Sequence, residues 1–280
     1  MNNKIINKDC FEVMRDMIHS NTFVDAIITS PPYNTNKKAG KKGTLNTVDV
    51  GSGFYSHVRY DSHIDKMTDS EYNSFTVNLF KHFDKILNTN GMVLYNLSYG
   101  SENTDGMFLA INEVITKTNF KIADVITWKK KNAMPNNMSR NKLTRIVEYI
   151  FVFVRDSEFM SFNSNKKVVS VRSNGQRMYE NVYNFIEARN NDEPCPYNKA
   201  TFSSELIDQL IDIYIKKGET VFDPFIGSGT TAISCINKGV NYIGSEISGK
   251  QCDWARERIS KHRKNIDEKA AASMTILNRK

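Results

Sequence analysis

Short apolar runs alternate with longer amphipathic segments along most of this 280-residue chain. The runs have the length and β-branched content of buried strands, and the segments between them carry apolar residues at helical spacing. Strands are predicted at residues 4–7, 26–29, 91–97, 123–128, 148–155, 220–222 and 241–244. Helices are predicted at residues 10–18, 69–87, 104–118, 203–215, 230–238 and 249–264. Such alternation usually forms a parallel sheet covered on both faces, so the pattern predicts an α/β domain with room for a small insert.

Two polar stretches interrupt this alternation. Residues 34–66 are rich in Asn, Lys, Gly, Ser and His, and residues 156–197 are polar with scattered aromatic residues and no clear period. Loops of this length in a compact domain are usually functional or mobile. We interpret residues 34–66 as a mobile loop at the carboxyl edge of the sheet and residues 156–197 as a small insert.

Composition narrows the class of protein. A hydrophobic fraction of 40% excludes a chain that is disordered throughout. No run reaches the roughly 18 apolar residues of a membrane span, and the polar first ten residues lack the apolar core of a signal peptide. The four cysteines form no Cys-x-x-Cys pair, which favours reduced thiols in a cytoplasmic protein over a zinc site or a disulfide framework. A net charge of +7 suggests a polyanionic partner, although surplus lysines on a soluble surface are an equally common cause.

A glycine-rich turn in the C-terminal third has the features of a ligand site. Residues 219–231 read ETVFDPFIGSGTT, which predicts a strand, a tight turn and the start of a helix. Asp223 is expected at the carboxyl end of that strand, where open α/β sheets bind ligands. The N–H groups of the following helix start attract an anion, and an acid at the end of the next strand commonly binds ribose hydroxyls. The predicted ligand contacts are Asp223, Pro224, Phe225, Gly227, Ser228, Gly229, Thr230, Thr231 and Glu246.

The turn differs from the known phosphate-binding patterns. A dinucleotide motif would need a third glycine at the position of Ala232, and no Gly-Lys-Ser/Thr sequence follows for a triphosphate loop. What remains is a ribose-bearing ligand with a small anionic group, and S-adenosylmethionine fits that description. A strand-to-helix turn without a ligand is the alternative for a single Gly-x-Gly.

The second motif, Ser30-Pro31-Pro32-Tyr33, follows the first long apolar run. Prolines have a fixed φ and no N–H donor, and Pro32 holds Pro31 extended. The carbonyls of Ser30 and Pro31 are therefore presented rigidly beside the ring of Tyr33. Rigid acceptors next to a stacking face suit a planar substrate that carries an amino group, such as a nucleobase. Taken alone, the motif is also compatible with a plain proline-rich turn.

Methylation of a base amine needs rigid hydrogen-bond acceptors beside a stacking face. The amine is a poor nucleophile because its lone pair is delocalised into the ring, and acceptors that hold its two hydrogens favour a pyramidal nitrogen and take up the developing charge. The methyl group of a sulfonium needs only an in-line nucleophile at near-attack distance, so neither a metal nor a covalent enzyme intermediate is expected. The target base would leave the duplex and stack on Tyr33.

Together the two motifs resemble those of the amino-group DNA methyltransferases, (D/N/S)PP(Y/F/W) and DPFxGSGTT. The catalytic motif comes first here, an order similar to the β class, in which a recognition insert lies between the motifs. The resemblance implies a Rossmann-like, seven-stranded and mostly parallel sheet with helices on both faces, in which 1–155 and 198–280 form the catalytic domain and 156–197 the target-recognition region. It also implies methyl transfer from S-adenosylmethionine to a flipped base in duplex DNA, with a homodimer and a cognate restriction enzyme as candidate partners.

Weaker matches occur in the same order as in the family. Asp9 and Cys10 are similar to an entry segment expected near the cofactor, and Ala200 and Phe202 match the segment before the cofactor strand. Departures from that segment's usual His, Pro and Pro occur at Asn198, Lys199 and Ser203. A third stretch resembles one that lies near the target base in the family and contributes Trp128, Arg145 and Glu148.

Basic residues near both motifs are the expected DNA contacts, since lysines pair with phosphates and arginine suits guanine. They are Lys37, Lys38, Lys41 and Lys42 after the catalytic motif, Lys130 after a strand end, and Arg172 and Arg177 in the insert.

The identity of the base is less constrained. In the family, serine at the position of Ser30 is commoner in enzymes that act on N4 of cytosine, whereas the PPYN run completed by Asn34 resembles adenine-N6 enzymes, so cytosine is slightly favoured. An RNA or protein-amide methyltransferase, or a catalytically silent DNA-binding subunit, is the alternative. The motif order disfavours the first and the intact motifs disfavour the second.

Overall fold

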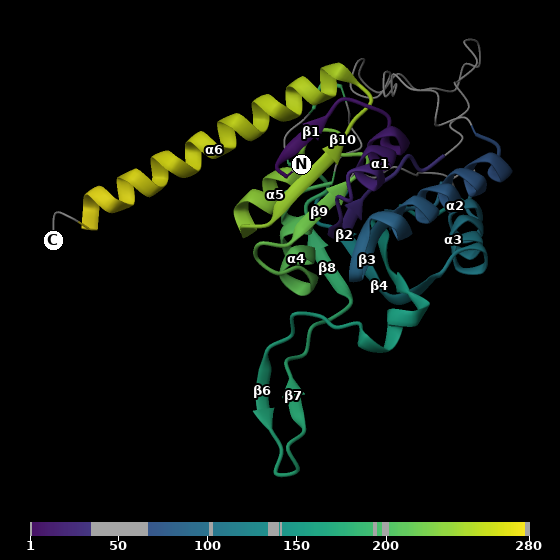
Figure 1. The fold of residues 1–280 in the computed structure, drawn as a ribbon, viewed down its shortest axis with the longest axis horizontal. Helices are drawn as coiled ribbons and strands as arrows, with labels where there is room; N and C mark the ends of the chain where they lie inside the picture. Colours follow the sequence, from purple (N-terminus) through teal and green to yellow (C-terminus); the bar gives the residue numbers. More distant parts are fainter. Residues whose placement is uncertain are drawn as a thin grey trace.

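The computed structural model describes residues 2–34, 67–100, 103–133, 140, 142–192, 195–197 and 202–277. A central sheet with helices on both faces carries two projections, a β-hairpin and the outer part of a long C-terminal helix (Figure 1). Most of the predicted loop 34–66 lies outside the described residues.

The central sheet of the described residues has eight strands. They are β1 (Lys4–Ile6), β2 (Val24–Thr29), β3 (Leu87–Leu97), β4 (Phe120–Lys130), β5 (Val147–Arg155), β8 (Phe185–Ala188), β9 (Thr220–Asp223) and β10 (Asn241–Ser245). Their order is β1-β10-β9-β2-β3-β5-β4-β8, and every pairing is parallel except those of β5 with β3 and β4. This mostly parallel sheet confirms the predicted α/β class.

In the described part of the chain, six α-helices pack on the two faces of the sheet. They are α1 (Cys10–His19), α2 (Asp69–Ile86), α3 (Gly106–Lys117), α4 (Ser204–Tyr214), α5 (Thr230–Lys238) and α6 (Gly249–Leu277). Helices α1 to α3 contribute to one hydrophobic cluster, and α4, α5 and the first turns of α6 contribute to the other. The start of α2 is the capping box that the spacing predicts, since Thr68 accepts from the Glu71 backbone and Glu71 accepts from the Thr68 backbone.

Alternate residues of the central strands feed opposite clusters. In β2, Ile27 belongs to the cluster of α1 to α3, whereas Ala26 and Ile28 belong to the cluster of α4 to α6. Successive side chains of a strand point to opposite faces, so a strand buried on both faces reads as a continuous apolar run. This explains the apolar run Ala26–Ile28 at the centre of β2, which is followed by the polar residues at the end of the strand.

The structure differs from the sequence predictions in three places. The short strand β8 makes the sheet eight-stranded instead of seven-stranded, and it comes from the range 156–197 that was interpreted as an insert. The same range forms a 3₁₀ helix, η2 (Asp156–Ser161), and the projecting hairpin of β6 (Val168–Val171) and β7 (Arg177–Tyr179). Helix α6 continues to Leu277 instead of ending at 264, because the added residues are mostly helix formers without Pro or Gly.

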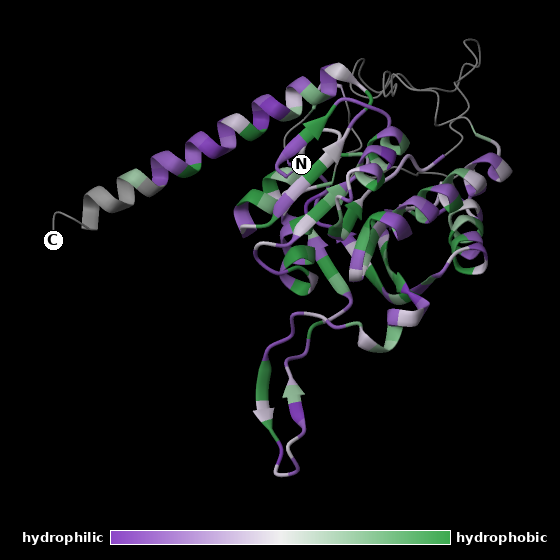
Figure 2. Ribbon diagram, in the orientation of Figure 1, coloured by the Kyte–Doolittle hydropathy of each residue, from purple (hydrophilic) through white to green (hydrophobic). Residues whose placement is uncertain are grey.

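The burial of their side chains explains why the sequence pattern did not predict β8 and the extension of α6. Ile186 and Ala188 are buried in β8, but two alternating apolar residues are too few for a pattern. Residues 261–269 of α6 are mostly hydrophilic and exposed, so this part of the helix carries no apolar stripe (Figure 2). Within the described part of the chain, no helix combines the length and apolar character that crossing a membrane requires.

Candidate active site

The two sequence motifs follow neighbouring strands and meet at the carboxyl edge of the sheet. Strand β2 leads into Ser30–Tyr33, and β9, its neighbour in the sheet, leads into the glycine-rich turn. The Thr29 hydroxyl donates to Asp223 Oδ1 at 2.8 Å, and both side chains are buried. The last residues of two strands that are far apart in the sequence are therefore joined by a direct hydrogen bond at the edge where parallel strands present ligands.

Asp223 holds the glycine-rich turn together. Besides Thr29, its carboxylate accepts from the Thr231 hydroxyl at 2.6 Å and from the Phe225 N–H at 3.0 Å. Its side chain is 1% exposed, and burial raises the pKa of the carboxyl group to about 6. Both carboxylate oxygens thus have partners within the protein, and the observed role of Asp223 is to shape the site.

The turn itself requires glycine. Gly227 and Gly229 have φ values of 47° and 81°, in the left-handed region that residues with a Cβ rarely adopt. A Cβ on Gly229 would also lie 3.1 Å from Cβ of Ala255 on α6. Gly229 is the N-cap of α5, so the turn ends where the backbone N–H groups of a helix start and can hold an anion.

The other predicted cofactor residues surround this turn or the neighbouring strand ends. Glu246 follows β10, accepts from the Ser248 N–H at 2.8 Å, and has a carboxyl pKa raised by burial. Asp9 caps α1 by accepting from the Phe11 N–H at 2.9 Å. Burial raises the pKa of the Cys10 thiol to about 12, which keeps it protonated and unreactive. Phe202 packs against the core, whereas Ala200 lies outside the described residues.

Ser30 and Tyr33 belong to a hydrogen-bonded network of polar side chains from three strand ends and from the turn formed by Ser30–Tyr33. The Ser30 and Tyr33 hydroxyls are 2.8 Å apart, and Tyr33 donates to Glu148 Oε2 at 2.9 Å. Asn96 Nδ2 lies 2.6 Å from the Tyr33 hydroxyl and 2.8 Å from Glu148 Oε2. Lys130 forms an ion pair with Glu148 Oε1. The network ties the Ser30–Tyr33 turn to the ends of β3 and β4 and the start of β5.

Two residues outside the motif fix the Ser30–Tyr33 turn from the side of α2. Tyr72 donates from its hydroxyl to the Pro32 carbonyl at 2.8 Å. Asn34 has a φ of 47° and donates from Nδ2 to the Met67 carbonyl at 2.9 Å. Asparagine is one of the few residues that tolerates this φ, so the turn gives Asn34 a local structural role that does not depend on the identity of the target base.

Sequence reasoning missed Asn96, Tyr72 and Thr29, and it reached Glu148 only through a resemblance. Asn96 gives a signal in retrospect, because it is a polar residue, 4% exposed, within the otherwise apolar second half of β3. Trp128 is buried and donates from Nε1 to the Ala188 carbonyl at 3.3 Å, so it anchors β8 to the sheet. Arg145 contacts the Tyr99 carbonyl and ring.

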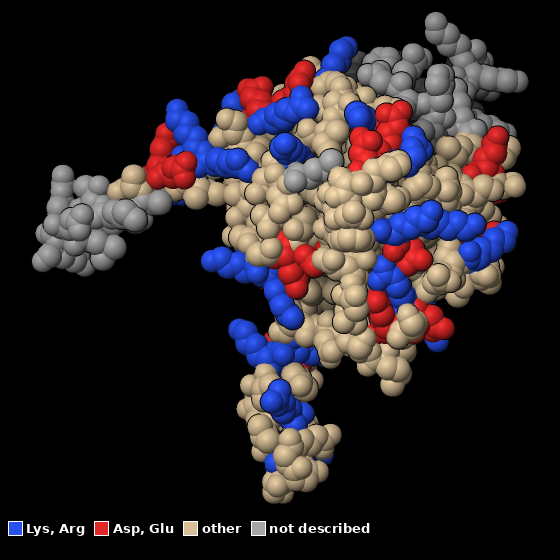
Figure 3. Space-filling view, viewed as in Figure 1, with Lys and Arg blue, Asp and Glu red and all other residues tan. Residues whose placement is uncertain are grey.

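The residues predicted to contact DNA differ in their position and exposure. Lys37, Lys38, Lys41 and Lys42 lie outside the described residues. Lys130 is paired with Glu148, so in this structure its ammonium group points into the protein network. Arg172 and Arg177 are exposed on the hairpin, where Lys and Arg side chains stand away from the body of the molecule (Figure 3).

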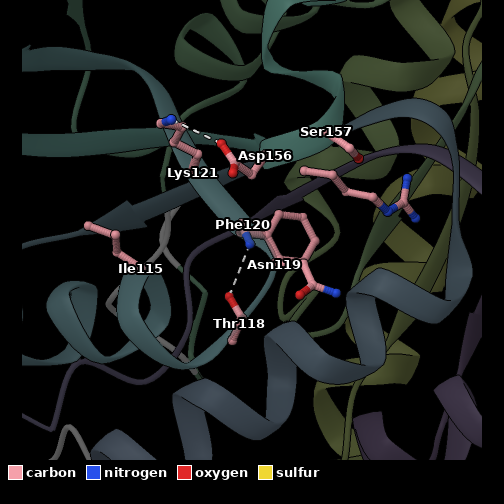
Figure 4. Close-up of a pocket in the computed structure, with 8 residues that line it drawn as sticks. Ile115, Thr118, Asn119, Phe120, Lys121, Asp156 and Ser157 are labelled. Carbon is pink, nitrogen blue, oxygen red and sulfur yellow. Dashed lines mark hydrogen bonds and ion pairs between the residues drawn. The ribbon is translucent and has the colours of Figure 1, made fainter.

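A pocket lies at the edge of the sheet opposite to the two sequence motifs. It lies between the end of α3, the start of β4 and the end of β5 (Figure 4). Its polar groups make structural bonds, including an exposed ion pair of Lys121 with Asp156 at 2.9 Å and the Phe120 N–H to the Thr118 hydroxyl at 3.3 Å. Neither sequence motif reaches this edge, so the pocket is not part of the candidate site.

Comparisons with known proteins identify the family of this chain. Residues 24–257 match a family model described as DNA methylase, which covers the N6 and N4 amino-group enzymes. The chain is 31% identical over 148 residues to the type II methyltransferase M.Cfr9I of Citrobacter freundii, a match that spans 52% of this chain and only 47% of that relative. It is 27% identical to the type II methyltransferase M.HinfI of Haemophilus influenzae over 98% of this chain and 73% of that one.

A solved structure shares the fold. The cytosine-N4-specific PvuII DNA methyltransferase superposes with a TM-score of 0.63 at 15% identity, covering 95% of this chain and 93% of that chain. At this identity the similarity establishes the fold alone, whereas the family model covers most of the sequence, including both motifs. The chain belongs to the N6/N4 amino-group DNA methylase family.

Proposed function

We propose that this protein transfers a methyl group from S-adenosylmethionine to the exocyclic amine of a base flipped out of duplex DNA. The observation that carries the proposal is the buried hydrogen bond between Thr29 and Asp223, because it joins the amine-binding motif to the cofactor turn. A methyl donor held at one loop is thereby placed next to an acceptor held at the other, which is the positioning that a direct transfer needs.

The residues at the turn fit the cofactor. The left-handed glycines Gly227 and Gly229 bring backbone N–H groups and the start of α5 to the place where a carboxylate group would bind. Glu246, at the end of the next strand, supplies a carboxylate for ribose hydroxyls. When bound, S-adenosylmethionine supplies an electrophilic methyl group on a sulfonium. The chain's own task is to hold and orient the amine.

Ser30, the Pro31 carbonyl and Tyr33 perform that task. Oxygen acceptors take the two amine hydrogens and favour a pyramidal nitrogen, and the Tyr33 ring provides the face on which the base stacks. The hydrogen bond from Tyr72 to the Pro32 carbonyl keeps the turn in place. We favour N4 of cytosine over N6 of adenine, because the hydroxyl of Ser30 stands where family members that act on adenine more often carry Asp or Asn.

The experiment that tests this function is methyl incorporation from labelled S-adenosylmethionine into duplex DNA prepared from a methylation-free host. Single-molecule sequencing of the product reports the modified base and the recognition sequence together. RNA added as a competitor should not reduce incorporation into DNA. If the protein binds the cofactor and methylates no genomic DNA, the proposed function is wrong.

The hairpin of β6 and β7 is our candidate for reading the DNA sequence. A two-stranded ribbon fits the major groove, and Arg172 and Arg177 are exposed on it together with Tyr179 and Tyr183. Such a small ribbon is only marginally stable alone, so we infer that DNA packs against it in the complex.

We also propose that the protein works in a restriction-modification system and that it forms a homodimer. Size-exclusion chromatography with light scattering would detect the dimer.

Replacing both Arg172 and Arg177 by alanine is expected to weaken binding to the recognised sequence by at least tenfold, since one good arginine-to-guanine pair contributes about 1–3 kcal/mol. Binding to unrelated duplexes should fall less, because phosphate contacts are independent of sequence. Fluorescence anisotropy on both duplexes measures the two affinities. Lys238→Ala, which removes an ammonium ion-paired with Asp212 on α4, is the control and should change neither. Equal loss on both duplexes would reassign the arginines to phosphates.

A further inference from the structure

The proposed function assigns no role to the carboxylate of Glu148. This side chain stands in β5 at the carboxyl edge, and the residue is 7% exposed. Oε2 accepts from the Tyr33 hydroxyl and from Asn96 Nδ2, and Oε1 pairs with Lys130. A nearly buried carboxylate in direct contact with the catalytic tyrosine calls for an explanation, since burying a charge is costly unless the surroundings use it.

The contacts fix the direction of every hydrogen bond between Ser30 and Glu148. A carboxylate can only accept, so the single hydroxyl hydrogen of Tyr33 is directed to Glu148. The Tyr33 oxygen must therefore act as acceptor in its 2.8 Å contact with Ser30, which makes Ser30 the donor. The amide of Asn96 also donates to the Tyr33 oxygen, at 2.6 Å. The chain of hydroxyls runs in one direction, from Ser30 through Tyr33 to Glu148.

This direction matters because a serine hydroxyl is chemically ambivalent. If its hydrogen pointed at the amine of the target base, it would engage the lone pair that must attack the methyl group. With its hydrogen held by Tyr33, Ser30 Oγ can offer only lone pairs, and those accept an amine hydrogen. The negative charge at the end of the chain also strengthens that acceptor, since linked hydrogen bonds polarise one another in a site of low dielectric.

We propose that Glu148 is a positioning residue that acts through Tyr33 to make Ser30 an obligate acceptor for the amine, and that it receives the proton which the amine releases. The inference rests on the proposed function. As the nitrogen–methyl bond forms and the methyl–sulfur bond breaks, one N–H bond of the amine breaks. Its proton moves to Ser30, the Ser30 hydrogen moves to Tyr33, and the Tyr33 hydrogen moves to Glu148. The nitrogen ends neutral and Glu148 ends protonated, and the proton passes to solvent after the product leaves.

Tyr33→Phe tests the chain, because it keeps the stacking ring and removes only the hydroxyl. We expect the single-turnover rate of methyl transfer to fall on the order of tenfold to a hundredfold, the lower range for a positioned proton acceptor. The dissociation constants for DNA and cofactor should change by less than about twofold. Glu148→Gln should lower the same rate in the same direction. The matched control is Glu158→Gln, which alters a paired carboxylate beside Arg155 at the other edge of the sheet and should leave the rate unchanged.

Ser30→Asp provides the rescue. A carboxylate accepts in any rotamer and needs no hydroxyl chain to orient it. In that background, Tyr33→Phe and Glu148→Gln should each change the rate by less than about twofold, so that the double-mutant cycles show strong coupling between position 30 and the other two. If the aspartate variant does not fold, Ser30→Asn offers a carbonyl oxygen for the same comparison.

The outcomes separate this inference from the proposed function. A wild-type protein that methylates no DNA overturns both. A wild-type protein that methylates DNA, with Tyr33→Phe and Glu148→Gln variants as fast as the wild type, overturns the inference alone. The inference is also wrong if Tyr33→Phe slows the serine and aspartate backgrounds equally, because the hydroxyl would then act independently of Ser30.

Discussion

Replacing Asp223 by alanine is expected to destabilise the protein by about 3 kcal/mol or more and to weaken S-adenosylmethionine binding by at least tenfold. The side chain accepts from the Thr29 hydroxyl, the Thr231 hydroxyl and the Phe225 N–H. A buried donor left without a partner costs about 1–3 kcal/mol, and alanine leaves three of them. Urea unfolding and isothermal titration calorimetry with the cofactor measure the two losses.

Thr29→Val and Thr231→Val serve as graded controls for the alanine variant. Each removes one hydrogen bond to Asp223 and keeps the shape of the side chain, so each should cost less than the loss of Asp223 itself. Thr29→Val should also slow methyl transfer, because Thr29 precedes the catalytic motif. Wild-type cofactor affinity in the alanine variant would contradict the role given to Asp223.

The burial of Asp223 also predicts a dependence of stability on pH. The pKa of its carboxyl group is about 6 in the folded protein, above the value of about 4 of an unfolded chain. Between these values the folded state binds more protons than the unfolded state, so the contribution of Asp223 to the free energy of unfolding falls as the pH rises from about 4 to about 6, and it is constant above. Asp223→Asn should remove this fall, as urea unfolding of both proteins across that range would show. Parallel pH curves for the two proteins would contradict it.

The pattern of apolar residues predicts the central strands, which are buried on both faces, and the helices that bury one apolar face. It fails for an element that is held mainly by pairing with a distant part of the chain. Strand β2 is readable because its apolar residues feed both clusters. Strand β8 is too short for a pattern and is held by pairing with β4 and by the hydrogen bond from Trp128 to the Ala188 carbonyl. The pairing joins residues distant in the chain, so a short window of sequence cannot contain it.

The same distinction holds for the site. The prolines and glycines of the two motifs are readable because proline fixes its own φ and glycine permits left-handed φ values, whatever surrounds them. Asn96 and Glu148 act only through the position of Tyr33, which depends on the order of β2, β3 and β5 in the sheet. Spacing in the sequence carries no trace of that order. The network around Tyr33 is therefore a result of topology.

Replacing Tyr33 by alanine is expected to reduce methyl transfer beyond the loss in Tyr33→Phe, because alanine removes the stacking face as well as the hydroxyl. Stacking of a base on an aromatic ring contributes about 1–3 kcal/mol, which corresponds to a further loss of about fivefold to a hundredfold. The ring also packs against the hydrophobic cluster under α1 to α3, so its removal loosens the turn. Single-turnover rates of the two variants isolate the contribution of the ring.

A duplex with a mismatched target base distinguishes stacking from a general disturbance of the site. A mismatch lowers the energy needed to move the base out of the helix, so it should restore part of the rate that Tyr33→Ala loses and have a smaller effect on the wild type. A site that is merely disordered would gain nothing from the mismatch. If Tyr33→Ala and Tyr33→Phe are equally slow on both duplexes, the ring does not hold the base, and the contribution of Tyr33 is confined to its hydroxyl.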